Sequence, residues 1–430
     1  MSTYDLLGIG IGPFNLSLAA LLDKTKSAKF LFLDDKPEFT WHKELMFKDA
    51  TMQTSFLKDL VTPVDPTSPY TFLNYLVEKG QFYHFLNTGR KSINRVEFED
   101  YCKWVSKQLG ASLKFGCRVQ KVVPTSEGYT VYHSQGSHQA KALCVASGPV
   151  PNIPECAKPH LGANVFHAKS AQAAKMNLEG KRLVVVGGGQ TGVELFRNAL
   201  KGQWGRPQSV RLLTGRENLR PLDEGPFTNE LFTPEFVSEF YQLPQSSKDE
   251  FSERLLLASD GNTPEYLQDF YNDLYLERFY FQQMPEAGIY PMRWMTNLVS
   301  MESGAYQLKV DNRLQQKEES FSADIVVLAT GFRSQIPQFL QDIEPEISKD
   351  FMGRPVIGSD YRLQMNSGLS PIYMMNFSRH GHGVADPQTS LMSWRSAVIA
   401  NKVLGNESYQ TSSTESKFVH YHNPIQEPSL

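Results

Sequence analysis

The stretches Tyr4-Asp-Leu-Leu-Gly-Ile-Gly-Ile-Gly12 and Lys181-Arg-Leu-Val-Val-Val-Gly-Gly-Gly-Gln-Thr-Gly192 decide the fold. Each runs from an apolar strand through a glycine-rich turn into an amphipathic stretch, the pattern of a strand, a turn and a helix. In a dinucleotide-binding turn the first glycine makes the bend, the second admits a pyrophosphate, and the third lets the helix pack on the strand. Two such turns predict an α/β protein with two Rossmann-like dinucleotide-binding domains.

The two turns fit this motif to different degrees. In the second turn, Gly187, Gly189 and Gly192 stand at the required spacing. The first turn reads Gly8-x-Gly10-x-Gly12, and Pro13 stands where the third glycine is expected. Proline is well tolerated in a first helical turn, so we retain both segments as nucleotide sites.

The residue at the end of the next strand distinguishes the two ligands. Asp34 ends the strand after the first turn, where a carboxylate binds a ribose 2′-hydroxyl and repels a 2′-phosphate. Arg216 follows the corresponding strand after the second turn, where an arginine pairs with the 2′-phosphate of NADPH. The alternative is that both are solvated charges at strand ends. The simplest assignment is FAD in the first domain and NADPH in the second.

Composition excludes several other classes of protein. The chain has 430 residues and a net charge of -3, without a block of basic residues, so we expect no nucleic-acid partner. The N-terminus lacks the basic region of a signal peptide, and Pro13 and Asn15 interrupt the first apolar stretch. We therefore expect a soluble, cytoplasmic protein without a membrane partner.

Redox-active disulfides and metals are not expected either. The four cysteines include no C-x-x-C pair, which argues against the dithiol-disulfide flavoenzymes. His380 and His382 lie one residue apart with no cysteine nearby, so we predict no metal site. With no dithiol relay, electrons from NADPH are expected to pass through flavin to oxygen or a small substrate, which favours a monooxygenase.

The chain is expected to divide into three parts and a tail. Apolar runs that end at Gly148 and Gly331 predict further strands. We assign residues 1–165 and 324–405 to the FAD domain and residues 170–222 and 280–323 to the NADPH domain. Residues 223–279 form a helical substrate-binding lid, whose last helix is capped by Thr263 and starts with Pro264. Residues 406–430 are a mobile tail.

Motifs along nearly the whole chain resemble the microbial flavin-dependent N-hydroxylating monooxygenases of siderophore biosynthesis. They include Gly10-Ile-Gly12-Pro13-Phe14-Asn15, Trp41-His42, the run from Met52 to Val61, Asp65-Pro66, Phe227-Thr-Asn229, Ala329-Thr330-Gly331 and His382-Gly383. Three stretches look most like the lysine N6-hydroxylases: Ser259-Asp260-Gly261, Asp386-Pro-Gln388 and Ser390-Leu-Met-Ser-Trp394. The ornithine N5-hydroxylases come next.

The resemblance implies an enzyme that uses FAD, NADPH and O2 to form a C4a-hydroperoxyflavin and hydroxylate a terminal side-chain amine. The residues expected to bind FAD are Gly8, Gly10, Gly12, Pro13, Asp34, Trp41, His42, Gln53, Thr330 and Gly331. Those expected to bind NADPH are Gly187, Gly189, Gln190, Thr191, Gly192 and Arg216. No residue is assigned as a catalytic acid or base, because the protein's task is to desolvate and position the amine. The family often forms homotetramers.

The resemblance also implies a site for the substrate, L-lysine or L-ornithine. Lys58 matches a family lysine that pairs with the substrate carboxylate. Asn229 matches an asparagine that helps to hold this carboxylate end of the substrate, and Ser390 matches a serine near the substrate amine. Without the motif, Lys58 reads as an exposed helix lysine. Ornithine-type enzymes carry an Asn-Tyr-Ser motif where this chain has Ser259 to Thr263, and Asn262 is the candidate substitute. L-Lysine is the expected substrate, and L-ornithine is the alternative. An NADPH oxidase or reductase without an organic substrate is the second alternative.

Overall fold

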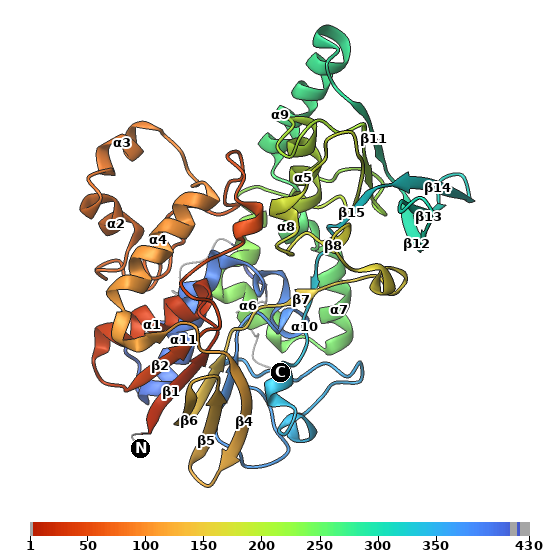
Figure 1. Ribbon diagram of the computed structural model, residues 1–430. Helices are drawn as coiled ribbons and strands as arrows, with labels where there is room; N and C mark the ends of the chain where they lie inside the picture. Colours follow the sequence, from red (N-terminus) through yellow and green to blue (C-terminus); the bar gives the residue numbers. More distant parts are fainter. Residues whose placement is uncertain (1–2, 413–418, 422–430) are drawn as a thin grey trace, which may run out of the picture.

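Two lobes, one built on a mixed sheet and one on a parallel sheet, make up the computed structural model (Figure 1), which describes residues 3–412 and 419–421. The first sheet has the order β3-β2-β1-β6-β5-β4, with β17 beside β6. Its parallel strands are β1 (Tyr4–Ile9), β2 (Phe30–Leu33), β3 (Leu113–Lys114), β6 (Gly136–Val145) and β17 (Ile372–Met374). The strands β4 (Val119–Thr125) and β5 (Gly128–His133) complete an antiparallel meander with β6.

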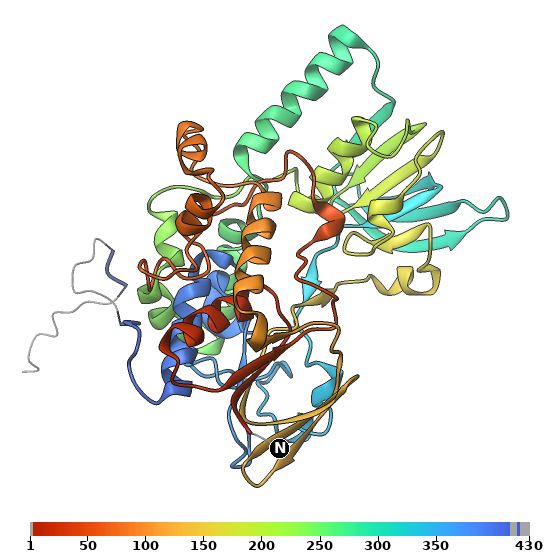
Figure 2. The same ribbon diagram turned by 60° about the vertical axis from the view of Figure 1, so that its left-hand side comes forward.

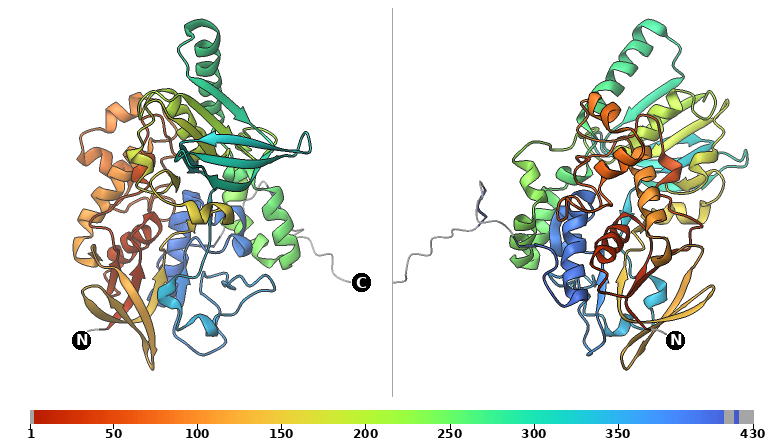
Figure 3. Two further views of the ribbon diagram at one scale, coloured as in Figure 1. Left: turned by 45° about the vertical axis from the view of Figure 1, so that its right-hand side comes forward. Right: turned by 90° about the vertical axis from the view of Figure 1, so that its left-hand side faces the viewer.

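The second sheet is entirely parallel, in the order β11-β10-β9-β15-β8. Its strands are β8 (Val165–His167), β9 (Arg182–Val186), β10 (Ser209–Leu213), β11 (Glu286–Tyr290) and β15 (Ile325–Leu328). A separate antiparallel sheet of β12 (Arg293–Ser300), β13 (Tyr306–Asn312) and β14 (Lys317–Ala323) lies beside it, as Figure 3 shows. The predicted α/β fold with two Rossmann-like domains is confirmed.

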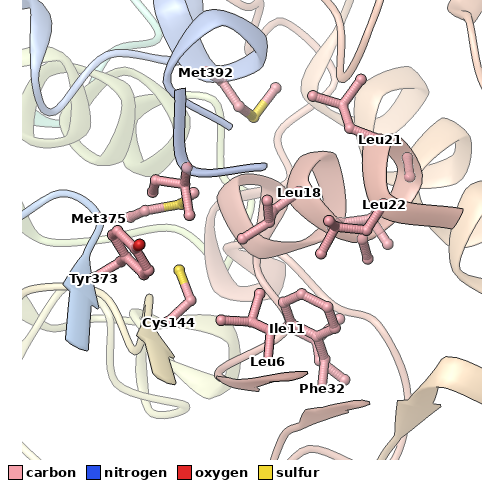
Figure 4. Close-up of a cluster of buried hydrophobic side chains, with 14 of the residues drawn as sticks. Leu6, Ile11, Leu18, Leu21, Leu22, Phe32, Cys144, Tyr373, Met375 and Met392 are labelled. Atoms are coloured by element: carbon pink, nitrogen blue, oxygen red, sulfur yellow. The ribbon is translucent and has the colours of Figure 1, made fainter. Parts of the chain in front are cut away.

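The first lobe buries its sheet under two helices that are far apart in sequence. Helix α1 (Pro13–Thr25) follows the first glycine turn, and α11 (Met392–Leu404) packs beside it. Leu18 and Leu22 of α1, Phe32 of β2 and Met392 of α11 converge on one apolar core (Figure 4). The helices α2 (Phe72–Glu78), α3 (Phe82–Asn87) and α4 (Arg95–Gln108) cover another side of this lobe (Figure 1).

The predicted domain boundary at residue 324 is wrong, because β15 is a central strand of the second sheet. It hydrogen-bonds to β9 on one side and to β8 on the other. The chain returns to the first lobe only after β15, through β16 (Phe332–Arg333), which pairs with β7 (Val150–Pro151). The strands β8 to β15 therefore belong to the second lobe, and β7 and β16 form a two-stranded connection between the lobes.

The predicted lid consists of helices that pack against different lobes. Helices α6 (Pro234–Gln242) and α7 (Gln245–Arg254) contact α10 (Arg379–His382) of the C-terminal segment. After the short α8 (Leu257–Asp260), α9 (Pro264–Leu276) starts at the predicted proline and packs on α5 (Gln190–Leu200), with the Phe196 and Phe270 rings 5.9 Å apart. The far end of α9 extends away from both lobes (Figure 2).

The predicted mobile tail begins with packed residues. Tyr409 is buried, and its hydroxyl donates to the Leu21 carbonyl of α1 at 2.6 Å. The indole nitrogen of Trp394 donates to the Thr411 carbonyl at 2.9 Å. Residues 413–418 and 422–430 lie outside the described residues. Within the described ranges, no helix is both long and apolar enough to cross a membrane.

Candidate functional site

A cleft of about 2340 Å³ lies where the two lobes meet, and both glycine turns line it. The predicted residues on its surface are Gly10, Gly12, Pro13, Asp34, Trp41, His42, Gln53, Thr330, Gly331, Gly187, Gly189, Gln190, Thr191 and Arg216. Gly8, Gly192, Lys58, Asn229, Asn262 and Ser390 do not line it. A typical pocket for one small ligand has about 300–1,000 Å³, so this cleft has room for more than one.

In the first turn, Gly10 and Gly12 act as the first and second glycines of the motif. Gly10 has a φ of +91°, and a Cβ there would meet the Ala146 carbonyl at 2.6 Å. Gly12 is the N-cap of α1, and a Cβ there would meet nothing within 4 Å. The open space over Gly12, together with the helix N-terminus, fits a pyrophosphate.

The third position of the first turn is Asn15, so the prediction that Pro13 replaces the third glycine is wrong. Asn15 is fully buried, and its amide donates to the Gly10 carbonyl at 2.7 Å. Gly8 lies within β1, where a Cβ would collide with the Phe32 ring at 1.9 Å. Gly8 is thus required for packing inside the sheet, whereas the prediction placed it at FAD.

The second turn has the three expected glycine environments. Gly187 has a φ of +125°, and a Cβ there would meet the Ala329 carbonyl at 2.1 Å. Gly189 caps α5 with nothing within 4 Å of its Cβ position. A Cβ on Gly192 would lie 1.9 Å from the Gly187 carbonyl, so this glycine allows close packing of the helix. The backbone at Gly189 is open toward a ligand.

The two residues predicted to distinguish the nucleotides both lie on the cleft, in different surroundings. Asp34 is buried and accepts hydrogen bonds from the backbone N–H groups of Ile11 at 2.6 Å and Lys36 at 2.9 Å. Its carboxylate therefore also holds the first glycine turn in place. The Nη1 atom of Arg216 is buried without a hydrogen-bond partner. An unpaired guanidinium nitrogen fits an anionic ligand such as a nucleotide phosphate.

The cleft wall near the first turn contains an uncharged imidazole. Burial, helped by the charges of Arg95 and Lys169, lowers the pKa of His42 to about 4. Its ring packs against the indole of Trp41 at 4.6 Å. Gln53 donates to the Gly261 carbonyl at 3.3 Å, so it connects the first lobe to the segment between α8 and α9. The hydroxyl of Thr330 is used at the connection between the lobes, where it donates to the Asn152 carbonyl at 2.5 Å.

Lys58 lies beside a small pocket that shares Met52 and Thr54 with the large cleft. The lysine is partly buried, and burial lowers the pKa of its ammonium group. No carboxylate of the described residues forms an ion pair with it. A partly desolvated cation next to the cleft is suited to binding the carboxylate of a ligand.

The other predicted substrate residues do not line the small pocket beside Lys58. Asn229 is exposed at the short helix η5 (Thr228–Phe232). Asn262 is fully buried, and its amide donates to the carbonyls of Gly188 at 3.1 Å and Arg220 at 3.0 Å. It therefore fixes the second glycine turn and has no amide hydrogen left for a substrate. The hydroxyl of Ser390 is buried without a partner, next to the cleft residue Thr389.

The structure adds contacts that the sequence did not indicate, and one of them joins the two lobes. Gln190, at the start of α5, accepts from the backbone N–H of Thr263 at 2.8 Å and donates to Glu194 at 2.8 Å. Arg95 of the first lobe donates to the same glutamate. Spacing offers no signal for the Gln190–Thr263 and Arg95–Glu194 contacts, since these partners are distant in the chain. Among the described residues, no group of three or more His, Cys, Asp or Glu side chains is placed to hold a metal.

Two glycine turns that open into one cleft define a protein with two dinucleotide-binding domains that share this cleft. The chain belongs to the L-lysine 6-monooxygenase/L-ornithine 5-monooxygenase family, whose sequence model matches residues 2–334. It is therefore a monooxygenase of the N-hydroxylating type, and the resemblance seen in the sequence is confirmed.

Three relatives show the range within this family. The L-lysine N6-monooxygenase of Escherichia coli is 38% identical over 412 residues, covering 95% of this chain and 96% of the relative. A putrescine N-hydroxylase of Shewanella oneidensis is 30% identical, covering 94% and 82%. The FAD-bound crystal structure of a desferrioxamine-pathway cadaverine monooxygenase from Erwinia amylovora has a TM-score of 0.90 at 26% identity, covering 98% of this chain and 100% of that one.

Proposed function

We propose that this chain hydroxylates the side-chain amine of L-lysine, giving N6-hydroxylysine for a hydroxamate siderophore, with FAD, NADPH and O2 as cofactor and co-substrates. The observation that carries the proposal is the shared cleft: both glycine turns face it, and the unpaired Lys58 lies beside it. Family membership supports the reaction class, and the 38% identical lysine enzyme supports the substrate.

The first turn is assigned to FAD and the second to NADPH. Gly12 and Gly189 each leave room at a helix N-terminus for a pyrophosphate. Asp34 suits a free ribose 2′-hydroxyl, and Arg216, with its unpaired nitrogen, suits the 2′-phosphate of NADPH. The Erwinia amylovora relative is bound to FAD in its crystal structure, which supports FAD as the flavin cofactor.

Bound flavin supplies two-electron chemistry with oxygen, and the protein's residues place the substrate and exclude water. An amine with a pKa of about 10.4 is almost entirely protonated at pH 7, and only its neutral form is nucleophilic. Lys58 would hold the carboxylate, so that the far amine extends toward Gln53 and the flavin. His42 stays uncharged above about pH 4 and adds no positive charge that would repel an ammonium group.

The choice of lysine over ornithine or a diamine rests on Lys58 and on the 38% identical lysine enzyme. Lys58 favours an amino acid, because a diamine has no carboxylate to pair with it. A 30% identical relative nevertheless acts on putrescine, and the family name includes ornithine. L-Ornithine, or activity on both amino acids, is the alternative. An NADPH oxidase without an organic substrate would have no need for an unpaired lysine beside the cleft.

The experiment that tests this proposal compares hydroxylamine formation with L-lysine, L-ornithine, putrescine and cadaverine, using protein loaded with FAD and supplied with NADPH. We expect the highest kcat/KM with L-lysine. Higher activity with L-ornithine would change the proposed substrate but leave the proposed reaction unchanged. NADPH oxidation that forms only hydrogen peroxide with all four amines would contradict the proposal.

A further inference from the structure

A tryptophan lies on the cleft wall directly beside Arg216. Strand β12 begins next to the loop that follows β10, because the backbone N–H of Met292 donates to the Arg216 carbonyl at 2.8 Å. The N–H of Arg293 donates to the Thr214 carbonyl at 2.9 Å. Trp294, the next residue of β12, lines the cleft together with Arg216. The start of β12 and the end of β10 therefore form one surface of the cleft.

The indole ring of Trp294 is held on two sides and is still half exposed. Gly215 lies against the ring, and a Cβ at this glycine would meet Trp294 Cε2 at 2.5 Å. The guanidinium group of Arg313 lies over the ring, 4.6 Å from its centroid. Even so, 49% of the surface of Trp294 is exposed. A fixed aromatic ring with free surface on a cleft is suited to contact a flat, apolar ligand group.

This part of the cleft is where the adenosine of a dinucleotide is expected. In a dinucleotide-binding domain the pyrophosphate lies at the helix N-terminus after the first strand, and the adenine ribose reaches the end of the next strand. In the second lobe these places are Gly189, the N-cap of α5, and Arg216, which follows β10. The adenine base is joined to the same ribose as the 2′-phosphate. A partner for the base must therefore lie next to Arg216, as Trp294 does.

The other aromatic rings on the cleft belong to different regions. Phe14, Trp41 and Phe339 pack against the core of the first lobe. Phe332 lies in the connection between the lobes, where its ring contacts that of His167 at 5.2 Å. Among the described residues, Trp294 is thus the phenylalanine, tyrosine or tryptophan that the second lobe contributes to the lining of the cleft.

We infer that Trp294 stacks on the adenine base of NADPH, beside the 2′-phosphate that Arg216 would bind. The inference rests on the proposed function and deepens it, because it gives the base and the phosphate separate partners. Stacking on an indole depends on the flat face of the base and not on the 2′-phosphate. Trp294 therefore contributes equally to the binding of NADPH and NADH, whereas Arg216 determines the choice between them.

The test uses FAD-loaded protein and 2′,5′-ADP, which is the adenosine end of NADPH without the nicotinamide. In Trp294→Leu, calorimetry should show a Kd about tenfold higher, the usual effect of losing one base–aromatic stack. Trp294→Phe keeps an aromatic ring and should retain most of the affinity. In Trp294→Leu the KM values for NADPH and NADH should rise by the same factor. The KM for reduced nicotinamide mononucleotide, which lacks the adenosine, should change little.

The controls separate stacking from support of the neighbouring turn. Val299→Ala changes an exposed residue of the same strand that does not line the cleft, and all these constants should stay at their wild-type values. If Trp294→Leu raises the KM for NADPH but not for NADH, the indole only holds Arg216 in place and the inference is wrong. An unchanged affinity for 2′,5′-ADP would also overturn it. If the wild type neither binds 2′,5′-ADP nor oxidises NADPH, the proposed NADPH site itself fails.

Discussion

Arg95 and Glu194 form a buried ion pair that joins the two lobes. The guanidinium group of Arg95, the first residue of α4, donates two hydrogen bonds of 2.8 Å to the carboxylate of Glu194 in α5. The glutamate side chain is fully buried and that of the arginine is 13% exposed. Burial raises the pKa of Glu194, although the adjacent arginine opposes this shift. The pair therefore fixes the second glycine helix relative to the first lobe.

Removing one partner of this pair should destabilise the protein. Glu194→Ala leaves the Arg95 charge buried without compensation, which costs about 3 kcal/mol of unfolding free energy. Chemical denaturation of the full chain measures this change. Glu155→Ala, which breaks the exposed pair between Lys158 and Glu155, should have an effect of less than about 1 kcal/mol. Equal losses for both variants would contradict a structural role specific to the Arg95 pair.

An alanine substitution in each glycine turn should show which cofactor that turn binds. Gly12 and Gly189 have ordinary φ values of -96° and -82° and free space at the Cβ position, so an alanine should leave the folded protein stable. Gly12→Ala should reduce FAD binding, and Gly189→Ala should raise the KM for NADPH while FAD stays bound. Absorbance of the retained flavin and steady-state kinetics measure these effects. Loss of FAD in Gly189→Ala would reverse our assignment.

Arg216 should provide the preference for NADPH over NADH. Replacing it with glutamine removes a charge that suits the 2′-phosphate, so the KM for NADPH should rise by about tenfold or more. The KM for NADH should change little, because NADH lacks that phosphate. Equal increases for both nucleotides would show that Arg216 only maintains the local structure.

Lys58→Ala should uncouple NADPH consumption from product formation. The variant should still oxidise NADPH, but the KM for L-lysine should rise by about tenfold or more and hydrogen peroxide should replace hydroxylamine. Hydroxylamine and peroxide are measured in the same reaction. Lys79→Ala, at the exposed C-terminal end of α2, should behave like the wild type. An unchanged hydroxylamine yield in the Lys58 variant would show that Lys58 does not bind the substrate.

His382 should make the protein less stable in acid. Burial lowers its pKa to about 4, below the ordinary value of 6.5, so the unfolded chain takes up a proton at a higher pH than the folded protein does. The stabilisation is complete above about pH 6.5 and is lost toward pH 4, by up to about 3 kcal/mol. His382→Gln should flatten this part of the stability curve, whereas replacement of the exposed His84 should not. An unchanged slope in the His382 variant would contradict the shift.

The strands and turns could be predicted from the sequence because their signals are local. Apolar runs, glycine turns and the Thr263-Pro264 start of α9 each depend on a few neighbouring residues. The third position of the first turn could not be predicted, because Asn15 fills it through a hydrogen bond that glycine spacing does not encode. The place of β15 depends on pairing with β8, a strand that lies far back in the chain.

The candidate site was predicted less completely than the fold. Most of the predicted residues near the glycine turns line the cleft, since their position follows from the strand ends, but Gly8 and Gly192 do not. Asn262 was assigned from its position before α9, but its amide is used inside the protein by Gly188 and Arg220. Trp294 reaches Arg216 through backbone hydrogen bonds between segments that are far apart in the chain, so only the structure could reveal this contact.

The most direct test of the central claim is the source of the oxygen atom in the product. The FAD-loaded protein is given NADPH, L-lysine and ¹⁸O₂, and the mass of the hydroxylated lysine is measured. Our account predicts that the product carries one ¹⁸O atom and that none is formed without NADPH. Product without the label, or consumption of the labelled oxygen only as hydrogen peroxide, would contradict it.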